Sequence, residues 1–135
     1  ESTPILFSGD TLFNACAGNC FNGGDVDQMF DSFKRELEPL PGSTILYPGH
    51  DYMKTNLGFA LNWEPDNQDA KYWQGKTKDL APDEMPYMTL EQERLYNPFL
   101  RLTSSHLLQE LEKKGGCVAS DRDVFKTLRA HRDHW

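Results

Sequence analysis

Three groups of side chains in this 135-residue sequence are of types that can do chemistry. The first is a carboxylate and an imidazole that each follow a short apolar run, Asp10 and His50. Both groups bind metal ions and transfer protons, and the sites of α/β folds collect at the ends of strands. The residues alone favour Asp10 as the cap of a turn. His50 is equally consistent with a structural hydrogen bond and with a site.

The second group is a pair of arginines, Arg129 and Arg132, near the end of a predicted C-terminal helix. Residues three apart point to the same side of a helix. Two guanidinium groups there suit a carboxylate ligand, because they offer paired charge-assisted hydrogen bonds. Taken alone, however, the two arginines are better explained as solvated side chains that complement the helix dipole.

The third group is the cysteines, Cys16, Cys20 and Cys117. Their odd number fits reduced thiols better than a disulfide framework. A Cys-x3-Cys spacing without a second pair is not a recognised zinc pattern, so we expect no metal at these thiols.

The elements that must position Asp10 and His50 are two strands and a helix. The apolar runs 4–7 and 44–47 predict strands, and the first is expected to be buried on both faces. Helical spacing over 25–38 places these apolar residues on one face: Val26, Met29, Phe30, Phe33 and Leu37. A strand–helix–strand order predicts parallel strands, with Asp10 and His50 at the same edge. Two strands are too few for an independent sheet, so we expect further strands from elsewhere.

The rest of the chain is predicted to be helical. Apolar spacing and capping residues predict helices over 53–62, over 66–78, from Thr89 to Asn97, from Ser104 or Ser105 to Gly115, and from Ser120 to the end. The proline-containing segment 80–88 is expected to be a loop. The last helix is predicted to have one apolar stripe: Val124, Leu128, His131 and Trp135.

Composition excludes some classes of partner. The formal net charge of −7, without a run of Lys and Arg, argues against nucleic acid. No apolar run approaches 18 residues and no basic-then-apolar leader is seen, which predicts a soluble intracellular protein without a membrane partner.

Several stretches, in order, resemble the glyoxalase II enzymes (hydroxyacylglutathione hydrolases) of the metallo-β-lactamase superfamily. The matching stretches are Phe7-Ser8-Gly9-Asp10-Thr11-Leu12-Phe13, Tyr47-Pro48-Gly49-His50-Asp51-Tyr52, Asn56-Leu57-Gly58-Phe59-Ala60, Glu64-Pro65-Asp66-Asn67, Asn97-Pro98-Phe99-Leu100-Arg101, Leu128-Arg129 and Arg132-Asp133. The resemblance implies an α+β fold. A partial metallo-β-lactamase αββα half-sheet is expected in residues 1–52, followed by an all-α C-terminal substrate-binding domain in residues 53–135.

The resemblance also implies a metal-dependent thioester hydrolase. In that family two divalent ions, usually zinc or iron, bind a hydroxide that attacks an S-2-hydroxyacyl-glutathione such as S-D-lactoylglutathione. The products are glutathione and a 2-hydroxy acid. The resemblance makes Asp10 the carboxylate that bridges both metals and His50 the last imidazole ligand. It places the enzyme in the cytoplasm or mitochondria.

Substrate-binding positions carry over in the same way. Tyr52 matches a glutathione-binding tyrosine, and Arg129 and Arg132 match a C-terminal basic pair. The loop of residues 17–23 departs from the family pattern: Asn19 stands where a positive charge is expected, and Phe21 where a tyrosine hydroxyl would bond the ligand. Both departures fall at positions that the resemblance assigns to binding of the thiol carrier.

The family's Thr-His-x-His-x-Asp-His motif does not occur in this sequence. Since two ligands cannot hold two metals, we expect the chain to be the C-terminal part of such an enzyme. It should bind metal poorly and be inactive alone, and it needs the upstream part to complete the site. A non-catalytic helical module that binds glutathione or a protein is the alternative. An iron enzyme resembling persulfide dioxygenases is disfavoured, because that relative lacks the helical tail containing residues 97–101.

Overall fold

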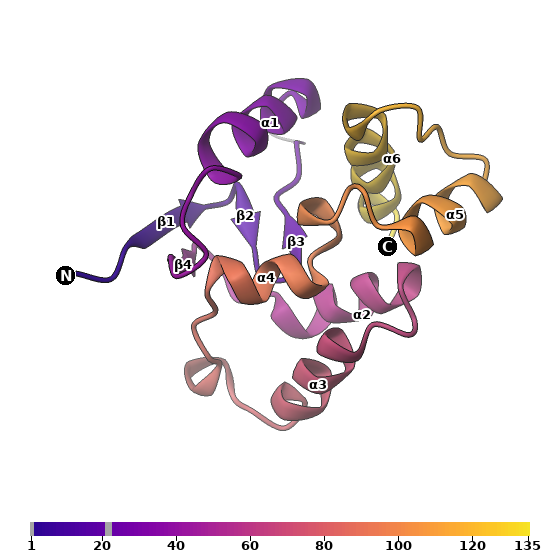
Figure 1. The fold of residues 1–135 in the computed structure, drawn as a ribbon. Helices are drawn as coiled ribbons and strands as arrows, with labels where there is room; N and C mark the ends of the chain where they lie inside the picture. Colours follow the sequence, from indigo (N-terminus) through magenta and orange to yellow (C-terminus); the bar gives the residue numbers. More distant parts are fainter. Residues whose placement is uncertain (1, 21–22) are drawn as a thin grey trace.

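The computed structural model describes residues 2–20 and 23–135, and its strands lie at one end of the molecule while helices form the other (Figure 1). The N-terminal part contains β1 (Ile5–Gly9), β2 (Leu12–Phe13), β3 (Cys16–Ala17), α1 (Val26–Ser32), the π-helical segment η1 (Phe33–Leu37) and β4 (Ile45–Pro48). The C-terminal part contains α2 (Met53–Trp63), α3 (Gln68–Thr77), the 3-10 turn η2 (Pro82–Glu84), α4 (Leu90–Tyr96), the 3-10 turn η3 (Pro98–Leu100), α5 (Ser105–Lys113) and α6 (Asp121–Asp133). The fold is therefore α+β with a helical C-terminal part, as expected.

The predicted crossover is confirmed, because β1 and β4 pair in parallel with Leu6 opposite Leu46. The segment before α4 borders the other edge of β4, where the Leu46 N–H donates to the carbonyl of Met88 at 2.8 Å. The expectation that the first strand is buried on both faces is wrong: Ile5 is 52% exposed and Phe7 is 79% exposed. β4 is the strand partner of β1 in the described residues, so β1 has one open edge and side chains that face solvent.

The helix expected over 25–38 forms, but its second half is not α-helical. Asp25 caps its start, since its carboxylate accepts from the backbone N–H groups of Asp27 and Gln28. From Phe33 onward the backbone is π-helical, and the Glu38 N–H donates to the Phe33 carbonyl at 2.8 Å. Phe33 and Leu37 are both buried. The π-helical turn thus places both Phe33 and Leu37 in the core.

Three helices of the C-terminal part, α4, α5 and α6, begin at the predicted caps. The Thr89 hydroxyl accepts from the Gln92 N–H while the Gln92 side chain accepts from the Thr89 N–H, which completes a capping box. Ser104 and Ser120 cap α5 and α6. No helix in the described residues is both long and apolar enough to cross a bilayer.

The apolar stripe predicted for α6 is only partly correct. Val124 and Leu128 are buried, but Trp135 is 53% exposed and His131 is half-buried. Phe125, which the stripe leaves out, is fully buried. The packed face is rotated by about one residue, because α6 lies against α1 as well as against η3.

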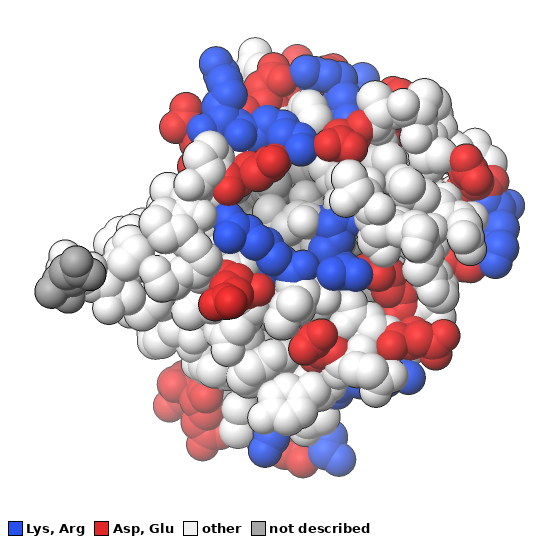
Figure 2. Space-filling view, in the orientation of Figure 1, with Lys and Arg blue, Asp and Glu red and all other residues white. Residues whose placement is uncertain are grey.

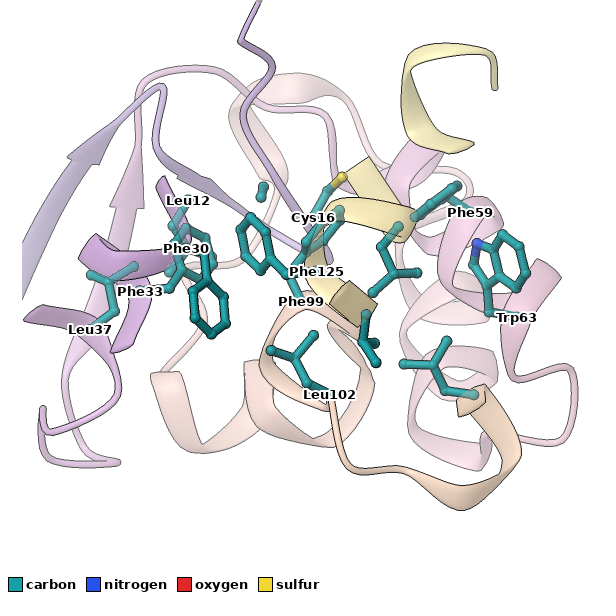
Figure 3. Close-up of a cluster of buried hydrophobic side chains, with 14 of the residues drawn as sticks. Leu12, Cys16, Phe30, Phe33, Leu37, Phe59, Trp63, Phe99, Leu102 and Phe125 are labelled. Atoms are coloured by element: carbon teal, nitrogen blue, oxygen red, sulfur yellow. The ribbon is translucent and has the colours of Figure 1, made fainter. Parts of the chain in front are cut away.

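One hydrophobic core extends from the strands into the helical part (Figure 3). Phe125 lies at its centre and makes edge contacts with Phe30, Phe33 and Phe99, at ring-centroid distances of 5.6, 5.0 and 5.1 Å. Leu12 and Cys16 of the β2–β3 hairpin belong to the same cluster. The hairpin is thus packed directly on the helices that follow it in sequence.

Candidate functional site

Asp10 and His50 meet at the carboxyl ends of β1 and β4, as the sequence predicts. The His50 Nε2 lies 3.3 Å from the Asp10 Oδ1, and the two side chains are 54% and 74% exposed. Just before them, the Gly49 N–H donates to the Gly9 carbonyl at 2.7 Å. A Cβ atom on Gly49 would lie 3.0 Å from both the Asp10 Oδ1 and the Gly9 carbonyl oxygen. The glycine therefore allows the close approach that joins the two strand ends.

Two hollows lie next to each other here, and Asp10 and His50 line the first of them. The first, which we call the histidine-side hollow, has a volume of about 390 Å³ and is lined by Asp10, Phe13, Asn19, Gly24, His50 and Tyr52. The second, the arginine-side hollow, has a volume of about 130 Å³, and its lining includes Asn56, Arg129, Arg132 and Trp135. Phe13, Asn19 and Tyr52 line both hollows. The structure thus brings the predicted metal residues and substrate residues to two sides of one shared wall.

Aromatic contacts hold the shared wall together. The Tyr52 ring stacks on the His50 imidazole at a centroid distance of 5.3 Å, and Phe13 packs edge-on against Tyr52 at 5.1 Å. Sequence reasoning missed Phe13 as a site residue. Its position three residues after Asp10, in the Leu12-Phe13 pair, was the available signal.

Arg129 is not a solvated side chain, which corrects the interpretation that the residues alone favoured. It is 5% exposed, and its Nη1 donates to the carbonyls of Ala17 and Gly18 at 2.6 and 2.7 Å. Its Nη2 pairs with the Asp133 carboxylate at 3.0 Å. Because a buried guanidinium must be paired to be tolerated, these contacts tie α6 to the strand β3.

Arg132 makes fewer hydrogen bonds than Arg129. Its Nη2 donates to the Asn56 Oδ1 at 3.1 Å, and its guanidinium lies 6.0 Å from the centre of the Phe59 ring. Its Nε is buried and has no hydrogen-bond partner among the residues that the structure describes. Arg132 lines the arginine-side hollow, and its positive charge suits an anionic ligand group there.

The two positions that depart from the family pattern have different outcomes. Asn19 lines both hollows, so it lies where a ligand bridging them would pass. Phe21 lies outside the described residues.

A metal site cannot be completed from the described residues of this chain. Within residues 2–20 and 23–135, no three His, Cys, Asp or Glu side chains are grouped so that they could hold a metal ion. Burial raises the pKa of the Cys16 thiol, although the nearby Arg129 and Arg132 oppose that change. Asp10 and His50 remain as an exposed carboxylate and imidazole that point at a common region.

A further hollow of about 250 Å³ opens between α1 and α4, on the face that Figure 2 shows. Its floor is aromatic, and charged side chains surround its mouth. These charged side chains already have partners: the Lys34 Nζ lies 2.8 Å from Glu38 and 3.0 Å from Asp121, and Arg94 donates to the backbone carbonyls of Glu38 and Leu40. We therefore do not include this hollow in the candidate site.

Comparison with known proteins identifies one family. Residues 51–135 match the family model described as "Hydroxyacylglutathione hydrolase C-terminus". The chain is 44% identical to the hydroxyacylglutathione hydrolase of a Polaromonas species, over 98% of this chain and 51% of that protein. It is 42% identical to that of Nitrosococcus oceani, over 100% and 52%, and 39% identical to one from Neisseria meningitidis, over 96% and 50%. The chain spans about half the length of the curated relatives it matches.

Proposed function

Because this chain belongs to the hydroxyacylglutathione hydrolase family, we propose that it forms the C-terminal half of a thioester hydrolase. The substrate class is S-2-hydroxyacyl-glutathione, such as S-D-lactoylglutathione, and the products are glutathione and a 2-hydroxy acid. One observation supports this more than any other. The exposed Asp10–His50 pair and the arginine-side hollow share a wall, so a thioester carbonyl and its thiol carrier can be held side by side.

The residues at the strand ends fit a divalent metal centre as a partial set of ligands. A carboxylate oxygen and an imidazole nitrogen lie 3.3 Å apart and both face open space, and both atom types bind zinc and iron. Two divalent ions bound there would supply a nucleophile at neutral pH and polarise the thioester carbonyl. Asp10 and His50 would hold them, and the upstream half of the protein would supply the other ligands, within a metallo-β-lactamase sheet to which β1 and β4 contribute.

The exposed face of β1 is consistent with such an upstream half. Phe7 is 79% exposed, and Tyr87 is 67% exposed. Between them, Tyr47 contacts both rings, at centroid distances of 5.4 and 4.5 Å. An exposed aromatic row across one face of a sheet is typical of a surface that another part of a protein covers.

Arg132 and Tyr52 are proposed to hold the thiol carrier. The Arg132 guanidinium, which lines the arginine-side hollow, would bind a carboxylate of glutathione, and Tyr52, which lines both hollows, would lie between the carrier and the metal residues. Arg129 would act mainly through the backbone of Ala17 and Gly18 that it holds. Asn19 would contribute an amide where a charged residue is expected, so the carrier must be tested directly.

The test compares this chain with the same protein extended upstream to the length of its relatives. The extended protein should bind two metal ions and hydrolyse S-D-lactoylglutathione, whereas the 135-residue chain should bind metal poorly and hydrolyse nothing. A His50→Ala variant of the extended protein should lose metal and activity together. An extended protein that carries two metals and fails on every acyl-thiol offered would overturn the proposal.

A titration separates the enzyme from a non-catalytic binding module. Glutathione, γ-glutamylcysteine and coenzyme A are added to the 135-residue chain, and amide chemical shifts around Tyr52 and Arg132 are followed by NMR. γ-Glutamylcysteine lacks the glycine carboxylate and is the matched control ligand. Tight metal-free glutathione binding, together with an inactive extended protein, would support the module instead.

A further inference from the structure

The β2–β3 hairpin has a turn that its own sequence does not favour. Ala15, in the turn, has a φ of 61°, a left-handed conformation that costs energy for any residue with a Cβ atom. It is also fully buried. A strained residue of this kind persists only where its surroundings determine the conformation.

Glu93 of α4 supplies those surroundings. It is fully buried, and its Oε2 accepts from the Ala15 N–H at 2.8 Å and from the Asn97 Nδ2 at 3.1 Å. Its Oε1 accepts from the Asn14 Nδ2 at 3.0 Å and from the Tyr96 hydroxyl. All four partners donate, so the site is built for a carboxylate, which only accepts.

Two asparagines extend this network to the rest of the turn and to the site. Asn97 donates to the carbonyls of Phe13 and Cys16, at 3.3 and 3.2 Å. Asn56 of α2 donates to the Asn14 carbonyl at 3.0 Å through its Nδ2, while its Oδ1 accepts from Arg132. An unbroken chain of hydrogen bonds therefore runs from Glu93 through Asn14 and Asn56 to Arg132.

The hairpin held in this way forms part of both hollows. Phe13 lines both, and Ala17 lines the arginine-side hollow. The hairpin closes where the Gly18 N–H donates to the Thr11 carbonyl at 3.0 Å. A Cβ atom on Gly18 would lie 1.6 Å from the Asp10 carbonyl oxygen. The position of the hairpin thus determines the wall between the predicted metal residues and the predicted carrier site.

We propose that Glu93 is a positioning residue for the substrate site: it holds the β2–β3 hairpin and, through Asn14 and Asn56, the Arg132 guanidinium. This inference rests on the proposed function, which supplies the identity of the substrate that Glu93 would help to position. Glu93 touches neither hollow, so its effect on the reaction is indirect.

The variant Glu93→Gln tests this role, because it replaces one acceptor oxygen with a donor amide that faces donor groups. Glu64→Gln is the matched control. Glu64 is a buried carboxylate that accepts from Arg101 and Ser104 and lines neither hollow. In the extended protein, Glu93→Gln should raise the KM for S-D-lactoylglutathione about tenfold with kcat within threefold and unchanged metal content. Glu64→Gln should leave the KM within twofold.

A second measurement does not depend on the substrate. In the 135-residue chain, Glu93→Gln should speed the hydrogen exchange of the Ala15 and Gly18 amides at least tenfold, and leave the amides of α5 unchanged. Tyr96→Phe removes only one donor to Glu93 and should give a smaller change in the same direction. If the extended wild type is inactive, the proposed function fails, and amide exchange still decides whether Glu93 holds the hairpin. Equal KM changes for the two glutamine variants, or unchanged hairpin exchange, would overturn the role of Glu93.

Discussion

The Arg129 guanidinium donates to the carbonyl of Ala17 at 2.6 Å, across 112 residues of sequence. This contact joins the last helix to the hairpin beside the strand ends. It also separates Arg129 from Arg132, which lies three residues later and bonds a side-chain amide instead. The two arginines that the sequence presents as a pair therefore have different expected effects when replaced.

Arg129→Ala is expected to destabilise the protein. It leaves the carbonyls of Ala17 and Gly18 and the Asp133 carboxylate without their donor, and breaking a buried charged contact costs about 3 kcal/mol. Urea unfolding of the 135-residue chain, followed by circular dichroism, measures the change in the free energy of unfolding. A loss below 1 kcal/mol would show that the contact is weak.

Arg132→Ala is expected to affect binding more than stability. It removes one hydrogen bond, worth about 1 kcal/mol to the free energy of unfolding. In the extended protein it also removes the proposed charged contact to the carrier, for which about 1.5–3 kcal/mol corresponds to a KM about ten- to a hundredfold higher. Arg132→Lys keeps the charge and should recover part of the loss. A KM unchanged in both variants would exclude Arg132 as a carrier contact.

Glu64 should make the stability of the protein depend on pH in the acidic range. Burial alone would raise the pKa of Glu64, but hydrogen bonds from Arg101 and Ser104 outweigh burial and lower it. Because the folded pKa lies below the ordinary value of 4.5, the stabilisation is fully present above that pH. It is lost as the pH falls through the folded pKa. The midpoint temperature of thermal unfolding should therefore fall more steeply between pH 6 and pH 3 for the wild type than for Glu64→Gln. Parallel curves of midpoint temperature against pH would contradict this.

Gly18→Ala should disrupt the hairpin. The added Cβ atom would overlap the Asp10 carbonyl oxygen, and overpacking against backbone costs about 1–3 kcal/mol or more. The extended protein should also lose activity, because Asp10 must shift. Gly75→Ala is the control: nothing lies within 4 Å of its added Cβ in α3, so it should stabilise by about 0.5–1 kcal/mol. Chemical denaturation of both variants gives the comparison, and equal effects would contradict the role of Gly18.

Phe7→Ala distinguishes an isolated surface from a covered one. In the 135-residue chain Phe7 is 79% exposed, so the change should alter the free energy of unfolding by no more than about 0.5 kcal/mol. If an upstream half covers β1, the same change in the extended protein removes a buried ring and should cost about 3–5 kcal/mol. A similarly small change in the free energy of unfolding of both proteins would mean that no upstream half covers the aromatic row.

Local signals in the sequence predict much of this fold. The parallel arrangement of β1 and β4, and hence the meeting of Asp10 with His50, follows from two apolar runs separated by a helix. Capping residues correctly predict where α4, α5 and α6 begin. The signal for each strand, helix and cap lies within a few residues, and the handedness rule for strand–helix–strand crossovers then supplies the parallel pairing.

The β2–β3 hairpin could not be predicted in this way. Its strands have two residues each, and the turn places Ala15, rather than glycine, in a left-handed conformation. Glu93 and Arg129 stabilise it from positions 78 and 112 residues away. Asn14 is the one local turn signal in this segment, and it does not predict the hairpin without these long-range side-chain contacts.

Cys16 gives this hairpin an internal chemical probe. Cys16 in β3 is 1% exposed, whereas Cys117 is exposed and Cys20 is half-buried. A thiol reagent can reach Cys16 only when the hairpin separates from the core. The slowest of the three alkylation rates therefore measures how often the wall of the site opens, on the unmodified sequence and without any substrate.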